Sequence, residues 1–329
     1  MELNSFYKKM DEWSAAGIPY LFIIDFEKQK PILKRLSELD NKEAAIWYSF
    51  PMMSNKDIWA TTGDRFTNLK LAKQAQDFEL YHEKFERAQQ LFQEKGVRVI
   101  NLTMPTAVHL PASMETIFQE AEAKYKILYK NHFVCCTPEI FVRIDKNGII
   151  RSYPMKGTID ANIPNAEELI LKNPKEEREH RSTVEQLIAD LSVVSSKVTV
   201  PRYRYIDRLH TTDKDLLQVS SEVRGELKDK YKRAYGSLLD CILPAGSIVG
   251  APRDKALAVI KEVEGYTRSY YTGVCGLFDG ETLDSCVLIR IIEQEEDGFF
   301  YKSGGGITAD STAESEYREL IDKIYVPLA

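Results

Sequence analysis

The strand-like segments of this chain are short, rich in aromatic and β-branched residues, and spaced irregularly among the helices. Turn-forming residues bound most of them, as is usual for strands. They do not alternate regularly with helices, as the strands of a doubly wound parallel sheet do. This order predicts an α+β fold, with strands at residues 20–26, 97–102, 141–144, 285–294 and 299–302.

Three helices have clear sequence signals. Apolar residues spaced by four, three and four positions begin at Tyr81 and predict an amphipathic helix that ends at Gly96. Asn173, followed by proline, predicts the start of a second helix. A capping-box pattern at 311–314 predicts the start of a third, near the C-terminus.

Composition restricts the classes of function. The chain has 329 residues, of which 43% are apolar, enough for one large domain or two lobes that share an interface. The net charge of −6 is spread without a Lys/Arg block, so nucleic acid is not an expected partner. The sequence has neither a signal-peptide core nor a membrane-spanning apolar run, which predicts a cytoplasmic protein. The five cysteines lack CxxC spacing and are expected to be reduced and structural, with no zinc site.

Two glycine-rich segments are candidates for binding an anion through main-chain N–H groups. At 246–256 a glycine turn leads into a helix near Pro252, where free N–H groups would attract a carboxylate. Gly304, Gly305 and Gly306 offer a similarly open backbone after a strand. Neither segment matches a Walker A loop or GxGxxG, so nucleotide binding has little support. Ordinary turns are the alternative for both.

Two cations lie beside apolar sequence. Arg290, within the predicted strand at 285–294, suits bidentate pairing with a carboxylate, and a buried or edge ion pair is the alternative. Lys156 lies between a strand-like run and a Gly-Thr turn. From local sequence alone, such a lysine is expected to be solvated.

Three glutamates lie on two of the predicted helices. Glu316 and Glu319 are three residues apart on the C-terminal helix, and Glu179 lies in the second turn of the helix that starts at Asn173. Together they would suit Mg²⁺, which prefers hard oxygen ligands. Solvated helix faces are the alternative explanation for each glutamate.

The five histidines are scattered, and no serine or cysteine lies in a GxSxG elbow. Catalysis by a serine or cysteine nucleophile is therefore disfavoured. For the same reason the chain is not expected to release ammonia from glutamine by itself.

The order of short motifs resembles the chorismate-utilising enzymes, a family that includes anthranilate, isochorismate, salicylate and aminodeoxychorismate synthases. The resemblance is collinear over residues 78–325, whereas residues 1–77 match less clearly. The motifs are NLT at 101–103, TPE at 137–139, PMKGT at 154–158, KxxxEH at 175–180, SEVRG at 221–225, GSIVGAPR at 246–253, YTGVCG at 271–276, IR at 289–290, GGGITADS at 304–311 and EYRE at 316–319.

The resemblance implies a fold and a division of the chain. The expected fold has two large antiparallel β-sheets packed as a sandwich, with helices around the outside. Residues 78–329 would form the chorismate-binding catalytic domain, and residues 1–77 would pack on the same core.

PMKGT resembles the aminodeoxychorismate synthases, whereas anthranilate synthases have alanine at the position of Lys156. The resemblance therefore implies component I of that enzyme, which converts chorismate and ammonia to 4-amino-4-deoxychorismate for p-aminobenzoate and folate synthesis. Lys156 would add to C2 of the ring as the 4-hydroxyl leaves, and Glu139 would protonate that hydroxyl. Ammonia would come from a separate glutamine amidotransferase subunit.

The resemblance also implies how substrate and metal bind. Glu179, Glu316 and Glu319 would hold Mg²⁺ against the ring carboxylate. The other implied positions are substrate-binding: Tyr271 and Arg290 for the enolpyruvyl carboxylate, Gly304, Gly305 and Gly306 for the ring carboxylate, and Ser247 and Gly250 as lining of the pocket.

Several positions depart from the family pattern. Ile188, Ala189 and Asp190 replace a frequent RND triplet, and Gln218 replaces a frequent histidine. Ser247 and Thr272 replace a usual threonine and cysteine. The departures around Ile188 and Gln218 keep one alternative open, a non-catalytic chorismate-binding subunit. The nearest alternative is an anthranilate or isochorismate synthase, and Lys156 argues against the first of these.

Overall fold

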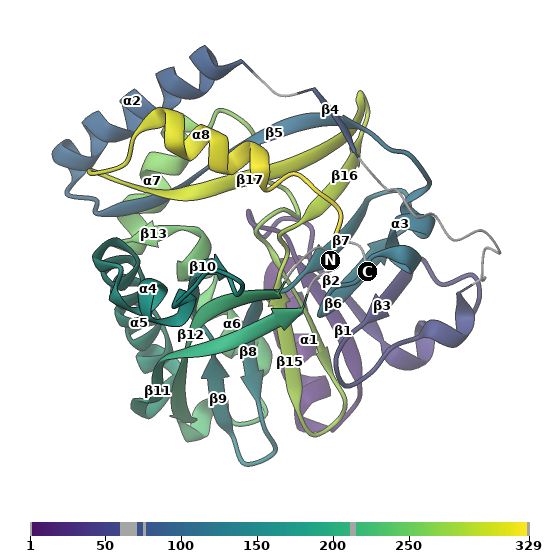
Figure 1. The fold of residues 1–329 in the computed structure, drawn as a ribbon. Coiled ribbons are helices and arrows are strands. Elements are labelled where there is room, and N and C mark those ends of the chain that lie inside the picture. Colours follow the sequence, from purple (N-terminus) through teal and green to yellow (C-terminus); the bar gives the residue numbers. More distant parts are fainter. Residues whose placement is uncertain (1, 60–70, 75–76, 211–214, 328–329) are drawn as a thin grey trace.

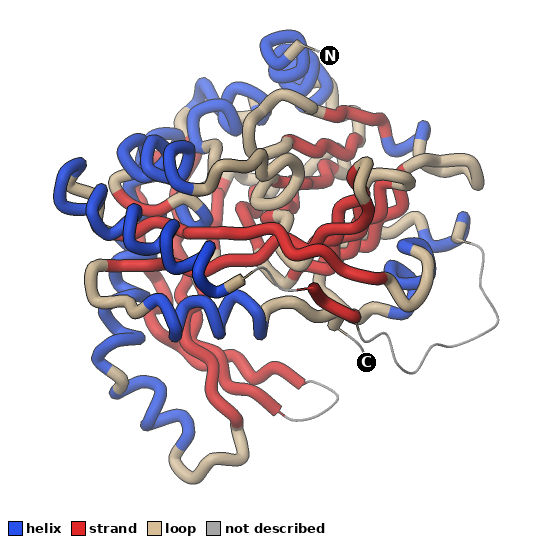
Figure 2. The backbone as a smooth tube through the Cα atoms, turned by 90° about the horizontal axis from the view of Figure 1, so that it is seen from above, coloured by secondary structure: helices blue, strands red, loops and turns tan. Residues whose placement is uncertain are grey.

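Two large antiparallel β-sheets form the centre of the molecule in a computed structural model, which describes residues 2–59, 71–74, 77–210 and 215–327. Helices lie around the outside of the sheets (Figure 1, Figure 2). Apolar residues of both sheets, such as Ile23 of one and Phe133 of the other, share one buried cluster, so the sheets pack face to face. The expected α+β sandwich is confirmed.

The first sheet has nine strands and contains both the N-terminal strand and the predicted lysine. Its strands, in spatial order, are β10 (Met155–Asp160), β12 (Asp215–Leu227), β9 (Ile149–Ser152), β8 (Ile140–Ile144), β15 (Leu283–Val287), β14 (Val274–Phe278), β1 (Tyr20–Ile24) and β2 (Ile32–Arg35). The long strand β11 (Ser195–His210) also pairs with β12.

The second sheet has eight strands. Their order is β13 (Gly250–Ala251), β5 (Val99–His109), β17 (Gly298–Thr308), β16 (Ile291–Glu295), β7 (Phe133–Thr137), β6 (Tyr125–Tyr129) and β3 (Ile46–Ser49), with β4 (Ala72–Gln74) also paired to β5. The paired registers of both sheets are antiparallel throughout the described residues.

The strand β1 is buried on both faces. Leu21 and Ile23 face the cluster between the sheets, whereas Tyr20, Phe22 and Ile24 belong to the cluster beneath the helices. A strand covered on both sides has no polar face, which explains the continuous apolar sequence YLFII. The N-terminal region therefore contributes directly to the first sheet.

The helices cover the outer faces of the two sheets. Figure 1 shows α2 (Phe78–Lys95), α7 (Arg253–Val263) and α8 (Ala313–Asp322) along β5 and β17. The remaining helices are α1 (Leu3–Ala15), α3 (Met114–Glu120), α4 (Ala166–Lys172), α5 (Pro174–Val194) and α6 (Tyr235–Ile242). Short 3₁₀ turns are η1 (Leu36–Glu38), η2 (Lys56–Ile58), η3 (Asp229–Tyr231) and η4 (Gly246–Ile248).

Two of the three predicted helix signals are confirmed in detail. The helix α2 ends at Gly96, which has a φ of 62° and closes the helix in the left-handed conformation. The Asn173 side chain accepts the Glu176 N–H at 3.3 Å and so caps α5. The third helix forms, but the capping-box contacts predicted at 311–314 do not, because α8 starts after Thr312 without a side-chain cap. Ser311 instead donates to the Glu316 carboxylate at 2.9 Å.

The predicted strand at 285–294 is wrong as one element. It divides into β15 and β16, which belong to different sheets. Arg290 lies in the connection between them, with a φ of 53°. A positive φ is unusual for a residue with a side chain, and it turns the chain from one sheet to the other. Arg290 therefore lies at the crossing between the sheets rather than inside a strand.

The expectation that residues 304–306 form an open loop after a strand is also wrong. The three glycines continue β17 and lie opposite Thr103, Leu102 and Asn101 of β5. A side chain on Gly304 would place its Cβ 2.3 Å from the Leu102 carbonyl oxygen, so the two strands approach too closely for any other residue.

Candidate active site

Lys156 lies on β10 where three cavities meet. These have volumes of about 730, 100 and 60 Å³, and Lys156 and Thr183 line all of them. The pairing of β10 with β12 is irregular between Met155 and Thr158, and Gly157 has a φ of 83°. This bulge lifts the lysine out of the regular strand.

The Lys156 amine is half-buried and makes no hydrogen bond or ion pair with any residue that the structure describes. On the facing strand β17, a Cβ added to Gly306 would lie 3.8 Å from the Lys156 Nζ. The absence of a side chain at Gly306 therefore leaves space in front of the amine. The local sequence led us to expect a solvated lysine, whereas the structure shows a lysine that faces a cavity.

Glu139 lies between β7 and β8 and lines the 100 Å³ cavity with Lys156. Burial raises the pKa of its carboxyl group, while a hydrogen bond from Ser247 and the charges of Lys156, Lys323 and Arg290 oppose that rise. The Ser247 Oγ donates to the Glu139 Oε1 at 3.0 Å. A carboxyl group that keeps its proton to higher pH than usual is suited to general acid catalysis.

The turn that carries Ser247 is held by contacts that require glycine at two positions. A Cβ on Gly246 would lie 2.3 Å from the Asp190 Oδ2, and one on Gly250 would lie 2.0 Å from the Val99 carbonyl oxygen. The turn can therefore pack closely against α5 and β5 at once. Gly250 lines the 60 Å³ cavity together with Lys156.

The predicted metal ligands come from two helices beside the largest cavity. Glu179 of α5 and Glu316 of α8 both line it. A Cβ on Gly305 would lie 3.2 Å from the Glu316 Oε2 and 3.6 Å from the Glu319 Oε1, so these two carboxylates are neighbours. Glu319 also pairs with Lys323 at 2.6 Å. Within the described ranges, no three His, Cys, Asp or Glu side chains form a group that could hold a metal ion.

Arg290 and Tyr271 lie near Glu139. The charges of Arg290 and Glu139 both affect the pKa of Tyr271, which burial raises. The Arg290 Nη1 donates to the Lys323 carbonyl oxygen at 2.6 Å, and the guanidinium lies 4.7 Å from the ring centroid of Tyr325. The Arg290 Nε is buried without a hydrogen-bond partner in the structure as described. Arg290 therefore retains an N–H group for an acceptor from outside the chain.

Lys323 was missed from the sequence. Its ammonium group pairs with Glu319 and donates to the Gly304 carbonyl oxygen at 2.8 Å, and its charge acts on Glu139. It joins the end of α8 to β17 beside the site. The spacing of four residues from Glu319 was the available signal, because such pairs meet on one helix face.

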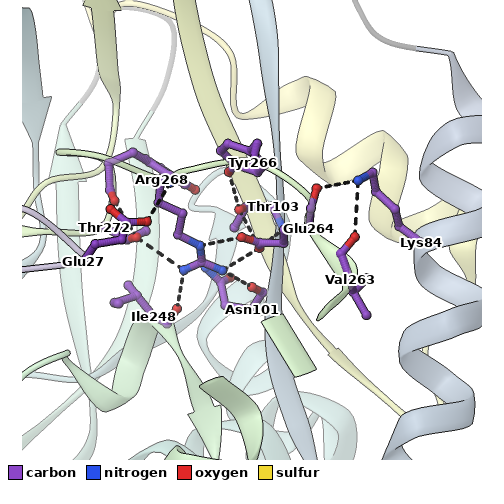
Figure 3. A network of polar contacts seen from close by, with 11 residues as sticks. Glu27, Lys84, Asn101, Thr103, Ile248, Val263, Glu264, Tyr266, Arg268 and Thr272 are labelled. Carbon is purple, nitrogen blue, oxygen red and sulfur yellow. Dashed lines mark hydrogen bonds and ion pairs between the residues drawn. The ribbon is translucent and has the colours of Figure 1, made fainter. Parts of the chain in front are cut away.

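Figure 3 shows a buried polar network around Arg268. The Arg268 carbonyl oxygen accepts the Tyr271 N–H at 3.2 Å. The Arg268 side chain is 1% exposed and donates twice to Glu264, at 2.6 and 2.8 Å. It also donates to the carbonyl oxygens of Ile248 at 3.0 Å and Asn101 at 2.6 Å. One guanidinium thus ties the end of α7, the turn that carries Ser247 and the strand β5 together. The sequence analysis missed this pair as well, although the two residues are four positions apart.

Most departures from the family pattern lie outside the cavities, but Ser247 lines two of them. Ile188, Ala189 and Gln218 line none of the three, whereas Gln186 and Leu187 line one each. Gln218 lies on β12, opposite Thr158 of β10. Asp190 keeps a structural contact, because it accepts a hydrogen bond from Gln186 at 2.9 Å and holds the turn at Gly246.

Comparison with known proteins identifies relatives over the whole chain. Residues 12–329 match the family model described as chorismate binding enzyme. The chain is 40% identical over 328 residues to an uncharacterised PabA-like protein of Pasteurella multocida, covering 100% of both. It is 39% identical over 326 residues to an uncharacterised PabA-like protein of Haemophilus influenzae, covering 99% of this chain and 97% of the other.

The fold also matches a solved structure. The menaquinone-specific isochorismate synthase of Escherichia coli superimposes with a TM-score of 0.71 at 17% identity, over 97% of this chain and 80% of the other. This likeness concerns the two-sheet fold alone. Among the described helices, none is long and apolar enough to cross a membrane.

Proposed function

The chain belongs to the chorismate-binding enzyme family, and we propose that it is component I of an aminodeoxychorismate synthase. It would convert chorismate and ammonia to 4-amino-4-deoxychorismate. The observation that carries the proposal is the Lys156 amine, which lacks a partner among the described residues and faces three cavities beside Glu139. Anthranilate synthases resemble this chain elsewhere but have alanine at this position.

Lys156 acts as the nucleophile in this proposal. In its neutral form the amine adds to C2 of the chorismate ring while the bond to the 4-hydroxyl breaks. Glu139 gives its proton to the departing hydroxyl, which leaves as water. The raised pKa of Glu139 supports this role, because the carboxyl group is protonated over a wider pH range than an exposed one.

The substrate carboxylates have two candidate sites. Tyr271 and Arg290 are proposed to bind the enolpyruvyl carboxylate, and the unpartnered Nε of Arg290 supports this. Gly304, Gly305 and Gly306 are proposed to bind the ring carboxylate. The pairing of β17 with β16 ends at Tyr301, before the three glycines, so β16 does not pair with them.

The carboxylates beside the large cavity fit Mg²⁺ by their chemistry. Glu179, Glu316 and Glu319 supply hard oxygen donors, and a cavity of about 730 Å³ leaves room for water and substrate. When bound, the ion would add positive charge near the ring carboxylate and favour elimination. Because the three carboxylates do not form a closed group without an ion, they would move together on binding.

Direct assay of the purified chain tests the proposal. It is incubated with chorismate, ammonium chloride and MgCl₂, and the product is detected as p-aminobenzoate after addition of a lyase. Formation of 4-amino-4-deoxychorismate is expected. Anthranilate or isochorismate would overturn the proposed product, and chorismate binding without turnover would indicate a non-catalytic subunit.

A separate glutamine amidotransferase is the proposed source of ammonia in the cell. The chain alone should use ammonium and fail with glutamine, and addition of the partner should confer glutamine-dependent activity. Full glutamine-dependent activity of the purified chain would contradict this.

A further inference from the structure

A small cavity lies beside Lys156 and Glu139, next to the larger one. Its volume is about 100 Å³, and it is enclosed by residues of β8, β9, α5 and the turn after α6. A water molecule occupies about 30 Å³ in the liquid, so this space suits a molecule of that size with one or two waters. It is far below the roughly 300 Å³ or more of pockets that hold drug-sized ligands.

The cavity is lined by the Lys156 amine, the Glu139 carboxyl group and the hydroxyl-bearing residues Ser152, Tyr153, Thr183 and Ser247. Three hydroxyl groups in its wall each use their single proton on an acceptor of the protein. The bonds run from Ser152 to the Phe141 carbonyl oxygen at 2.9 Å, from Thr183 to the Glu179 carbonyl oxygen at 3.0 Å, and from Ser247 to the Glu139 carboxylate at 3.0 Å. In the described chain none of these three oxygens accepts a hydrogen bond. Since a hydroxyl oxygen has two lone pairs, each can still accept one.

The rest of the wall is mainly apolar, with side chains that include Ile140, Phe141, Leu187 and Ala245. Such a wall disfavours a charged ligand, because burial penalises the charged form. The cavity therefore suits a small neutral molecule that donates hydrogen bonds. Chorismate is too large for a space of about 100 Å³.

We propose that this cavity binds ammonia, the second substrate. The inference rests on the proposed function. Ammonia has three N–H donors and one lone pair, so acceptors in the wall can hold the N–H groups and leave the lone pair directed at the ring beside Lys156. Glu139 lines the same cavity, and it is also the group proposed to protonate the departing 4-hydroxyl. The incoming nitrogen would thus start next to the carbon that the hydroxyl leaves.

The second half of the reaction balances with the groups present. The ammonia nitrogen forms a bond to C4, both ring double bonds shift, and the bond between C2 and the Lys156 Nζ breaks. Lys156 leaves with its electron pair as the neutral amine. The new C4 ammonium passes one proton to the Glu139 carboxylate, which lost its own proton to the departing hydroxyl. The net reaction is chorismate plus ammonia to 4-amino-4-deoxychorismate plus water.

Ser152 allows a test with a matched control. Ser152→Ala removes one acceptor from the cavity wall and enlarges the cavity by no more than that one oxygen atom. Ser285→Ala is the control, because Ser285 is also buried on the first sheet and donates to a backbone carbonyl, that of Val142, at 2.7 Å. Ser285 does not line the 100 Å³ cavity. Both variants lose a buried hydrogen bond to a backbone carbonyl, and Ser285→Ala also loses the one that Ser285 accepts from the Val142 N–H at 3.1 Å. Only Ser152→Ala changes the cavity.

Initial rates of the purified chain are measured with ammonium chloride varied at constant pH, ionic strength and saturating chorismate and Mg²⁺. Ser152→Ala is expected to raise the KM for ammonia about three- to tenfold, the range for loss of one hydrogen bond. The KM for chorismate and the rate at saturating ammonia should stay as in the wild type, and Ser285→Ala should change none of these.

An unchanged KM for ammonia in Ser152→Ala, or an equal rise in Ser285→Ala, would overturn the ammonia site while leaving the proposed function intact. If the wild-type chain forms no amino product with any ammonium concentration, the proposed function is wrong and this inference falls with it.

Discussion

Lys156 of β10 and Lys302 of β17 lie on different sheets of the molecule, and their surroundings differ. Lys302 is 2% exposed, and its Nζ lies 2.6 Å from the Glu293 Oε2 and 2.9 Å from the Glu295 Oε1. Lys156 is half-buried, faces the cavities and has no such partner in the described residues. One ammonium group is fixed by carboxylates, whereas the other is not.

The difference teaches how one fold uses the same side chain in two ways. The two carboxylates hold the buried Lys302 Nζ in one place, so Lys302 forms a structural ion pair. That pair also holds Tyr271, whose N–H donates to the Glu293 Oε1 at 2.8 Å. A lysine whose amine is not held by a carboxylate can approach a substrate in the cavity, as a nucleophile must. The paired lysine supports the wall of the site, and the unpaired one is available for chemistry.

The largest effect on the rate is expected when the Lys156 amine is removed. Lys156→Ala should lower the rate of 4-amino-4-deoxychorismate formation by about 10⁴-fold or more, because it removes the covalent nucleophile. The initial rate with saturating chorismate and ammonium measures this, and circular dichroism checks the fold. Lys172→Ala, at an exposed lysine on α4, is the control and should keep wild-type activity. Undiminished turnover in Lys156→Ala would show that the amine is not the nucleophile.

Lys302→Met should act on stability first. It leaves the buried Glu293 carboxylate without its cation, which typically costs about 3–5 kcal/mol of the free energy of unfolding. Urea denaturation measures the loss. The double variant Lys302→Met with Glu293→Gln should recover part of it, since the amide needs no counter-charge. No recovery in the double variant would mean that the charge pair is not what stabilises this wall.

A smaller effect concerns the pH dependence of catalysis. Glu139 must be protonated to act as an acid, so the rate should fall as pH rises through its pKa. The Ser247 hydrogen bond favours the carboxylate and lowers that pKa. Ser247→Ala should therefore move the alkaline limb of kcat to higher pH, by up to about one pH unit. A profile of kcat against pH at saturating substrates measures the shift, and a shift to lower pH would contradict the assignment of Glu139.

The smallest effect is expected at an exposed ion pair. Lys172 and Glu168 are 2.5 Å apart on α4, with side chains 75% and 59% exposed. Lys172→Met should change the free energy of unfolding by less than about 1 kcal/mol, because solvent screens such pairs. The same urea experiment applies. A loss as large as that of Lys302→Met would show that burial is not what distinguishes the two lysines.

Much of the architecture could be predicted from the sequence, because local patterns indicate the helices and the order of the motifs indicates the fold. The signal of helix α2 and the cap at Asn173 are short-range features, and the structure keeps them. The division of residues 285–294 was not predictable from the pattern. A continuous apolar run has the same sequence pattern whether it forms one strand or two strands of different sheets. Only the packing of the two sheets forces Arg290 to a positive φ.

The candidate site was predictable in its members and less so in its contacts. The motifs named Lys156, Glu139 and Ser247, and the structure brings all three to one cavity. The absence of a partner for Lys156 and the three acceptor hydroxyls depend on distances between segments far apart in the sequence. No spacing along the chain reports such distances.

The position of β1 has a consequence for how the molecule folds. Tyr20 of β1 lies opposite Phe278 of β14, although most of the chain separates them. During synthesis β1 can pair at once with β2, but its other neighbour β14 follows only after the long intervening segment has been made. One edge of the apolar strand YLFII therefore stays unpaired meanwhile, and a contact of such long sequence separation slows folding.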